Sequence, residues 1–305
     1  MVQFRRDPIG IHFFCRDTGL NVLFDEARVV PGEWSIAPRH VSIALGNACD
    51  FKCLYCYAPK NAGRIEADQA IAWAEELDSL DCLGLGFGGG EPTLYKDLAF
   101  ICREVSARTA LSVSLTTHGH HFDRELSDAL AGHVHMIRVS MDGMHDVYEA
   151  NRGHSFAKLQ ARIPVIRDTA RFGVNYLVNT GTVAGLTQAA EFAFGEGASE
   201  MLLLPEVGPS GTLDLDEAVL NQLEEWIAEN HATFRLAISE IGTTRVRGPW
   251  LPIRQDEHPC RELMHIDAAG MLHPDAFSER SVRISDFKTM ADAITAMREQ
   301  ISTNH

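Results

Sequence analysis

Three cysteines in one short loop are the residues of this sequence whose type and spacing best suit chemistry. Cys49, Cys53 and Cys56 are separated by three and then by two residues, in a run that also contains Tyr55 and Tyr57. Cysteine thiolates are the usual protein ligands of iron–sulfur clusters. Three thiolates on a cluster of four irons leave one iron without a protein ligand. The spacing therefore predicts a reactive metal site with an open coordination position.

A structural zinc site and a disulfide are the alternatives for this loop. Structural zinc sites normally take four Cys or His ligands, whereas the loop contains no His and the next cysteine is Cys82. Seven cysteines cannot all pair, and here they are scattered through a long chain, unlike those of a small secreted scaffold. An iron–sulfur cluster is the favoured interpretation.

The elements that must position this loop alternate between strand and helix. Short apolar runs, which predict buried strands, alternate with segments of helical periodicity. The expected strands are at residues 41–45, 83–87, 111–116, 136–140, 176–183 and 201–204, and the expected helices at 64–80, 94–107, 124–130, 156–172 and 186–194. Six strands separated by helices predict a parallel sheet with right-handed crossovers.

Further elements flank this alternating core. A β-hairpin is expected at residues 11–25, where Gly19 supplies the turn, and helices are expected at 213–230 and 287–300. We expect an α/β fold with three parts: an N-terminal hairpin extension (1–40), a partial (β/α)6 TIM-like barrel (41–212) and a small α+β C-terminal cap packed on the barrel (213–305).

A glycine-rich turn is the second motif. Gly-Gly-Gly-Glu-Pro at residues 88–92 follows the second expected strand, just as the cysteine loop follows the first. Functional residues of parallel sheets gather at the carboxyl ends of the strands. Gly89 and Gly90 would let the backbone pass close to a ligand. We therefore expect the two motifs to meet at one edge of the sheet.

The composition and charge of the chain argue against several classes of protein and of binding partner. The chain has 305 residues, of which 45% are hydrophobic and 23% charged, as in an ordinary globular protein. Its formal net charge of −15 argues against a nucleic-acid partner. No apolar run is long enough to cross a membrane, and the N-terminus does not read as a signal peptide. An unpaired set of cysteines and an oxygen-sensitive cluster both point to a reducing compartment, so we expect a cytoplasmic location.

In this order on consecutive strands, the two motifs resemble those of the radical S-adenosylmethionine (SAM) superfamily, over about residues 41–205. The resemblance implies one [4Fe-4S] cluster on Cys49, Cys53 and Cys56, with SAM bound at its open iron. It also implies an electron donor of the flavodoxin or ferredoxin type. The 5′-deoxyadenosyl radical released from SAM would then take a hydrogen atom from the substrate.

The resemblance further implies a set of SAM contacts. The turn with Glu91 would hold the methionyl amino group, and a tyrosine of the cysteine loop would lie beside the adenine. Ser140 would bind the carboxylate or the ribose, and Arg152 would pair with the carboxylate or would be a surface residue of a turn. The implied contacts are Tyr55, Tyr57, Gly89, Gly90, Glu91, Pro92, Ser140, Arg152 and Leu204.

His118 departs from the family's pattern, which often has Asn at this place after a Thr. Two interpretations stay open. His118 could face the substrate and handle a proton, or it could simply replace the Asn in a turn.

The segment from Cys260 to Asp275 resembles the start of the SPASM or twitch cap of peptide- and protein-modifying relatives. Asp275 stands where that pattern has its second cysteine, and no cysteine follows Cys260. One cysteine cannot hold a cluster in the usual way, so we expect a degenerate cap without an auxiliary cluster. Cys260 could be a hydrogen-atom donor near the active site or a small buried residue.

The first functional expectation is a radical SAM enzyme that modifies a peptide or protein side chain. Residues 1–40 are too short for the winged-helix leader-binding domain of many such relatives, although the hairpin edge could pair with an extended peptide. An alternative is oxidation or epimerisation of a small metabolite such as a sugar or aminoglycoside. An alternative of another class is an iron–sulfur protein for electron transfer or sensing, without SAM turnover.

Overall fold

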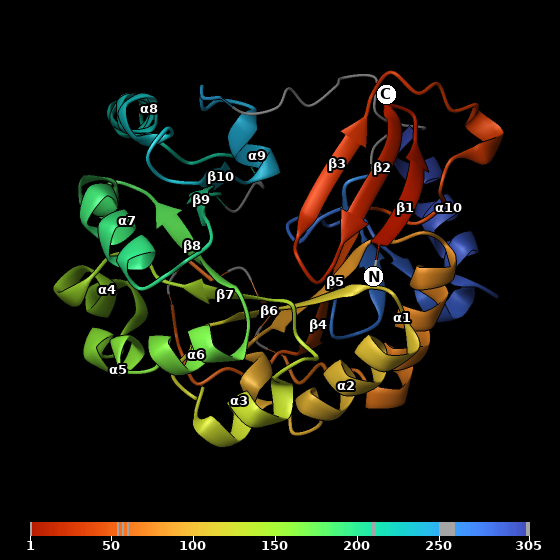
Figure 1. The fold of residues 1–305 in the computed structure, drawn as a ribbon, viewed down its shortest axis with the longest axis horizontal. Helices are drawn as coiled ribbons and strands as arrows, with labels where there is room; N and C mark the ends of the chain where they lie inside the picture. Colours follow the sequence, from red (N-terminus) through yellow and green to blue (C-terminus); the bar gives the residue numbers. More distant parts are fainter. Residues whose placement is uncertain are drawn as a thin grey trace.

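A computed structural model describes residues 2–53, 55–56, 58–59, 61–208, 212–249 and 260–302. Its centre is a ten-stranded sheet with the strand order β10-β9-β8-β7-β6-β5-β4-β11-β12-β13 (Figure 1). The six expected strands lie side by side and are all parallel: β4 (His40–Gly46), β5 (Gly84–Gly89), β6 (Ser112–Thr117), β7 (Met136–Ser140), β8 (Phe172–Val178) and β9 (Met201–Pro205). The expected α/β fold with a partial barrel is confirmed.

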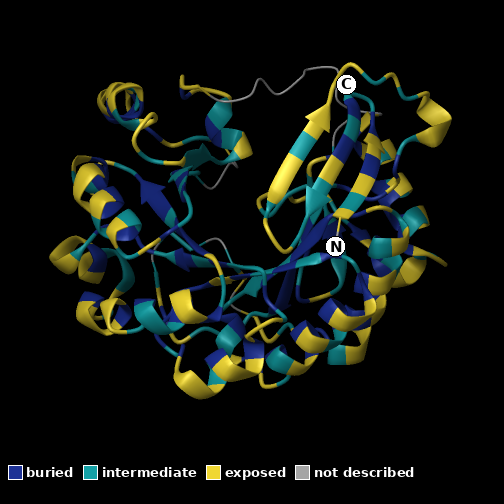
Figure 2. Cartoon of the chain, viewed as in Figure 1, coloured by how far each residue is buried: buried dark blue, intermediate teal, exposed yellow. Residues whose placement is uncertain are grey.

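Helices cover the outer face of this sheet (Figure 1). They are α1 (Ala67–Ser79), α2 (Leu98–Arg108), α3 (Arg124–Leu130), α4 (His145–Arg152), α5 (Phe156–Gln160), α6 (Ile163–Thr169) and α7 (Leu186–Gly195). Alternate strand residues face these helices and are fully buried, among them Val41, Leu85 and Ile137. Figure 2 shows the resulting dark core between sheet and helices. The apolar runs of the sequence are therefore the helix-facing side of the barrel.

The structure corrects two element boundaries. The single helix expected at 156–172 is two helices, α5 and α6, because Pro164 stands in the first turn of α6 and proline does not continue a helix from the preceding turn. The strand expected at 176–183 begins earlier, at Phe172, and ends at Val178. Beyond it Asn179 accepts a hydrogen bond from the Thr182 backbone, which closes a turn. The helix α4 was not expected.

The C-terminal region extends the sheet at both edges rather than only packing on it. β10 (Leu236–Ile238) lies parallel beside β9, and β11 (Leu263–Ile266) lies parallel beside β4. β12 (Met271–His273) and β13 (Val282–Arg283) follow as antiparallel strands. The helices of this region are α8 (Glu217–Asn230), α9 (Glu240–Thr243) and α10 (Met290–Ser302). The cap thus adds strands to the same sheet whose strand β4 leads into the cysteine loop.

The expected N-terminal hairpin is two strands of a three-stranded sheet, β1 (Val2–Asp7), β2 (Gly10–Cys15) and β3 (Leu20–Phe24). Arg16 donates to the carbonyls of Thr109 and Leu111, which immediately precede β6, and Gln3 donates to the carbonyl of Cys82, which precedes β5. This sheet therefore lies at the amino ends of the barrel strands. A peptide on its edge would lie at the end of the barrel away from the cysteine loop.

Candidate active site

The structure brings the cysteine loop and the glycine-rich turn together at the carboxyl ends of β4 and β5. The backbone N–H of Gly90 donates to the carbonyl of Gly46 (2.8 Å), and that of Glu91 donates to the carbonyl of Ala48 (2.8 Å). Gly89 has a φ of +111°, and a Cβ on Gly90 would lie 2.2 Å from the Ala48 oxygen. The two glycines are therefore needed because the turn packs directly on the backbone that carries Cys49.

Glu91 ties this turn to the end of β6. Its carboxylate is buried, and one oxygen accepts from the hydroxyls of Thr93 and Thr117, each at 2.6 Å. The other oxygen accepts from the backbone N–H of His118 (2.9 Å). Pro92 is buried and opens the short 3-10 turn that follows. Glu91 thus fixes two neighbouring strand ends, while its contact with the methionyl amino group stays a prediction.

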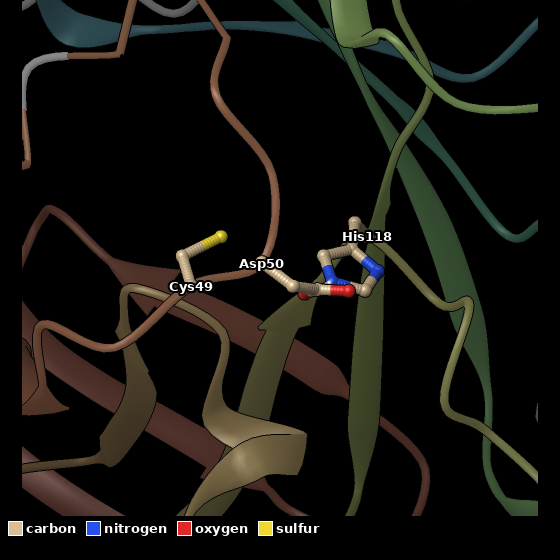
Figure 3. Close-up of side chains that lie close together, drawn as sticks. All are labelled: Cys49, Asp50 and His118. Atoms are coloured by element: carbon tan, nitrogen blue, oxygen red, sulfur yellow. Dashed lines mark hydrogen bonds and ion pairs between the residues drawn. The ribbon is translucent and has the colours of Figure 1, made fainter.

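His118 is a buried hydrogen-bond donor beside the first cysteine (Figure 3). Its Nδ1 accepts from the backbone N–H of His120 (3.1 Å), so the ring proton is on Nε2, which lies 3.0 Å from Asp50 Oδ1. Burial lowers the pKa of His118, which favours this neutral form. Ligand atoms of Cys49, Asp50 and His118 lie within 4.8 Å of one another. A protonated Nε2 cannot coordinate, so the group supports the loop rather than holding a single metal ion.

Phe51, between the first two cysteines, is held in a stack of aromatic rings. It is almost fully buried, with the ring of His118 at 3.8 Å on one face and that of His154 at 3.7 Å on the other. Contacts on both faces leave the Phe51 ring one position, which fixes this part of the loop. Sequence reasoning missed this residue, although its place inside the cysteine loop was a signal.

Tyr55, between Cys53 and Cys56, is bonded to the end of β7. Its hydroxyl donates to Asp142 Oδ2, and Arg152 Nη2 lies 2.6 Å from the same oxygen. Asp142 is buried and its other oxygen accepts from the backbone N–H of Leu177 (3.0 Å). Arg152 is the last residue of α4 and its side chain is mostly buried, so it is not a surface residue of a turn. Asp142 was missed, although it lies two residues after Ser140.

The other residues expected to bind SAM or the cluster are partly buried or lie outside the described part of the chain. Ser140 ends β7 and Leu204 lies in β9, and both are partly buried. Cys53 and Cys56 are also partly buried. Tyr57 lies outside the described residues. The SAM and cluster roles of these residues stay predictions.

The inner face of the barrel is polar and accessible to solvent, which was not expected. TIM barrels fill this space with branched apolar side chains. Here the inward-facing and at least partly exposed residues include Ser42, Ser114, Thr116, Arg138, Asn175, Glu200 and His265. Arg138 pairs with Glu200, and Ser42 Oγ lies 2.7 Å from Nδ1 of His265 in the cap. The interior can therefore receive a polar substrate.

Cys260 does not lie at this site, which corrects the hydrogen-donor interpretation. It precedes β11, whose Leu263 pairs with His40 at the start of β4, whereas Cys49 follows the carboxyl end of β4. The seven residues of β4 alone span roughly 20 Å. Burial raises the pKa of Cys260 to about 12, and the residue packs against the hydrophobic core. It is a small, partly buried residue at the opposite end of the barrel.

No helix among the described residues is long and apolar enough to cross a membrane.

The family model of the Radical SAM superfamily matches residues 43–189. A GTP 3′,8-cyclase of Rhizobium etli is 25% identical over 197 residues, which are 59% of this chain and 55% of the relative. An AdoMet-dependent heme synthase of Methanosarcina barkeri is 29% identical over 172 residues, 53% of this chain and 49% of the relative. The chain spans about half the length of these curated relatives.

Solved structures match over much more of the chain. Streptococcus suis SuiB bound to its precursor peptide SuiA has a TM-score of 0.76 at 12% identity, covering 98% of this chain and 89% of that one. The enzyme anSMEcpe with bound AdoMet (SAM) and a Cp18Cys peptide has a TM-score of 0.67 at 17% identity, covering 87% and 82%. At these identities the likeness shows a shared fold.

Proposed function

Because the chain belongs to the radical SAM superfamily of enzymes, we propose that its substrate is a side chain of a peptide or protein. Membership implies a [4Fe-4S] cluster and SAM, which together supply a 5′-deoxyadenosyl radical when bound. Cys49, Cys53 and Cys56 would hold the cluster. The chain's own task is to hold this loop and to orient the substrate in the barrel.

The three loop cysteines fit a cluster. None of the seven cysteines forms a disulfide. In the described part of the chain, the one ligand group compact enough for a single ion combines Cys49 with Asp50 and His118, and leaves out Cys53 and Cys56. Three half-buried thiols that are spread too widely for one ion suit a larger metal centre.

The observation that carries the peptide assignment is the likeness of nearly the whole chain, cap included, to two peptide-bound structures, SuiB with SuiA and anSMEcpe with Cp18Cys. The polar barrel interior supports it, because a peptide side chain entering there would meet the Arg138–Glu200 pair and, on the cap side, His265. Polar groups placed in this way fix the orientation of a bound ligand.

A small-molecule substrate is the second candidate. The curated relatives are named as enzymes of small molecules, a GTP 3′,8-cyclase and a heme synthase. The same polar interior would suit a sugar or an aminoglycoside. The sequence relatives favour this candidate, whereas the structural neighbours favour the peptide.

We further propose that the chain carries a single cluster. Cys260 lies at the far end of the barrel, and burial raises the pKa of Cys82 to about 11. Burial also raises the pKa of Cys102. Buried thiols of high pKa are poor metal ligands. A flavodoxin or ferredoxin would supply the electron, and iron analysis should give about four irons per chain after reconstitution.

The function is tested by 5′-deoxyadenosine release from reduced, reconstituted protein in the presence of host-cell extract. Ultrafiltration would separate a peptide-and-protein fraction from a small-metabolite fraction, and half of each would be treated with protease. We expect stimulation by the peptide fraction that protease removes. Stimulation by the small-metabolite fraction, with no effect of protease, would instead establish the second candidate.

A further inference from the structure

We propose that Asp142 positions both the cysteine loop and Arg152, so that one buried carboxylate supports cluster binding and SAM binding together. Asp142 lies in the connection between β7 and α4. The proposal rests on the family's cluster and SAM but not on the identity of the substrate.

Asp142 is immobilised by four partner residues from three segments, namely β8, the cysteine loop and α4. Oδ1 accepts from the backbone N–H of Leu177 (3.0 Å) in β8, and Oδ2 accepts from the Tyr55 hydroxyl and from Arg152 Nη2 (2.6 Å). The main-chain carbonyl of Asp142 accepts from Asn151 Nδ2 (3.0 Å). Only 2% of the residue is exposed. Hydrogen bonds to a buried carboxylate are stronger than those between neutral groups.

The bond to Tyr55 reaches the part of the loop that carries the second and third cysteines. Tyr55 lies between Cys53 and Cys56, and the backbone N–H of Cys56 donates to the carbonyl of Cys53 (3.2 Å). The two cysteines therefore share one tight turn, and the Tyr55 side chain joins this turn to the barrel. Cys49 is held differently, by the hydrogen bond from Glu91 to Ala48. Loss of Asp142 should loosen Cys53 and Cys56 more than Cys49.

The bond to Arg152 leaves part of its guanidinium available for a ligand. Its side chain is 11% exposed, and its charge lies 5.8 Å from the centre of the Tyr55 ring. Arg152 Nε is buried and makes no hydrogen bond within the described part of the chain. Buried donors of this kind are rare without a partner. Asp142 thus fixes one edge of the guanidinium and leaves Nε–H for an anionic group such as the SAM carboxylate.

Four variants separate the two effects. Asp142→Asn keeps the shape but loses the charge, Tyr55→Phe removes only the loop's hydroxyl, and Arg152→Gln removes only the guanidinium. Asp146→Asn, at an exposed position in α4, is the matched control. Each would be reconstituted anaerobically, its iron and sulfide per chain measured, and the SAM Kd of its cluster-loaded fraction determined by calorimetry. Thermal melts would show whether each variant is folded.

We expect Asp142→Asn to lower iron per chain at least twofold and to raise the SAM Kd at least tenfold. Tyr55→Phe should lower iron and, because phenylalanine keeps the aromatic ring, should change the SAM Kd of the loaded fraction far less than Arg152→Gln does. Arg152→Gln should raise the SAM Kd and leave iron unchanged. A role in general stability alone would not produce this split.

Full iron content with unchanged SAM affinity in Asp142→Asn would overturn the proposal, as would equal losses in Asp146→Asn. If Asp142→Asn does not fold, Tyr55→Phe and Arg152→Gln still test the proposal. It requires loss of iron mainly in Tyr55→Phe and weaker SAM binding mainly in Arg152→Gln. None of these assays uses the substrate, so a wrong assignment of peptide specificity would not affect the result.

Discussion

The backbone of Gly90 packs against the carbonyl of Ala48, so closely that a Cβ on Gly90 would lie 2.2 Å from the Ala48 oxygen. The residue after Gly90, Glu91, donates its N–H to that same oxygen. The glycine-rich turn therefore supports the backbone that leads into the cysteine loop. Whatever else the glycine-rich turn contacts, it determines where the strand end carrying Cys49 can lie.

Gly90→Ala should destabilise this junction. The added methyl group must displace main-chain atoms, and overpacking of this kind costs about 1–3 kcal/mol. We expect a lower free energy of unfolding in urea and less iron bound after reconstitution. Gly88→Ala is the matched control, since its Cβ would approach nothing closer than Thr116 Cβ at 4.0 Å. Equal behaviour of the two variants would refute the packing explanation.

Phe51→Leu should weaken the support of the cysteine loop. Leucine is still apolar but cannot stack between His118 and His154. The loss of buried packing contacts should cost about 1–2 kcal/mol, and bound iron should be released faster to a chelator. Phe100→Leu, at an exposed position in α2, is the control. Iron release at the wild-type rate in Phe51→Leu would contradict this account of the loop.

Stability of the cluster-free protein should fall in mild acid through His40. Burial lowers the pKa of His40 to about 4, from an ordinary value of 6.5. Between these values the unfolded chain binds the proton and the folded chain does not, so the free energy of unfolding falls as the pH drops. From about pH 7 to about pH 5, His40→Gln should lose ~2 kcal/mol less than the wild type in urea titrations. A His40→Gln curve parallel to the wild type would rule the explanation out.

Cys260→Ala should retain full turnover with its substrate and full 5′-deoxyadenosine release. Cys260 lies before the amino end of β4, while the cysteine loop follows the carboxyl end. The substitution should still reduce stability modestly, because Cys260 packs against the core. A selective loss of turnover in a folded Cys260→Ala protein would show that this residue takes part in the reaction after all.

Much of this architecture could be predicted from the sequence because the signals are local. The apolar runs identified the six central strands, and the two motifs at their ends were expected to meet, as they do. The break before α6 also had a local signal, Pro164, which was overlooked. Alternating small polar residues such as Ser112 and Ser114 in β6 could have indicated the solvated interior.

The features that were missed depend on contacts between distant segments. Asp142 acquires its importance only when Tyr55 and Arg152 reach the same carboxylate oxygen. The position of the N-terminal sheet depends on Arg16, whose partners lie about ninety residues further along the chain. The place of Cys260 follows from the parallel pairing of β11 with β4, which no periodicity in the cap predicts.

The central claim is that the Cys49 loop supports reductive cleavage of SAM. The most direct measurement is 5′-deoxyadenosine release from anaerobically reconstituted protein, reduced with dithionite and supplied with SAM. Wild-type protein should release it, and Cys49→Ser, Cys53→Ser and Cys56→Ser proteins, each checked for folding, should release none above background. A cluster-loaded wild-type protein that released no 5′-deoxyadenosine with dithionite, flavodoxin or ferredoxin would contradict the account.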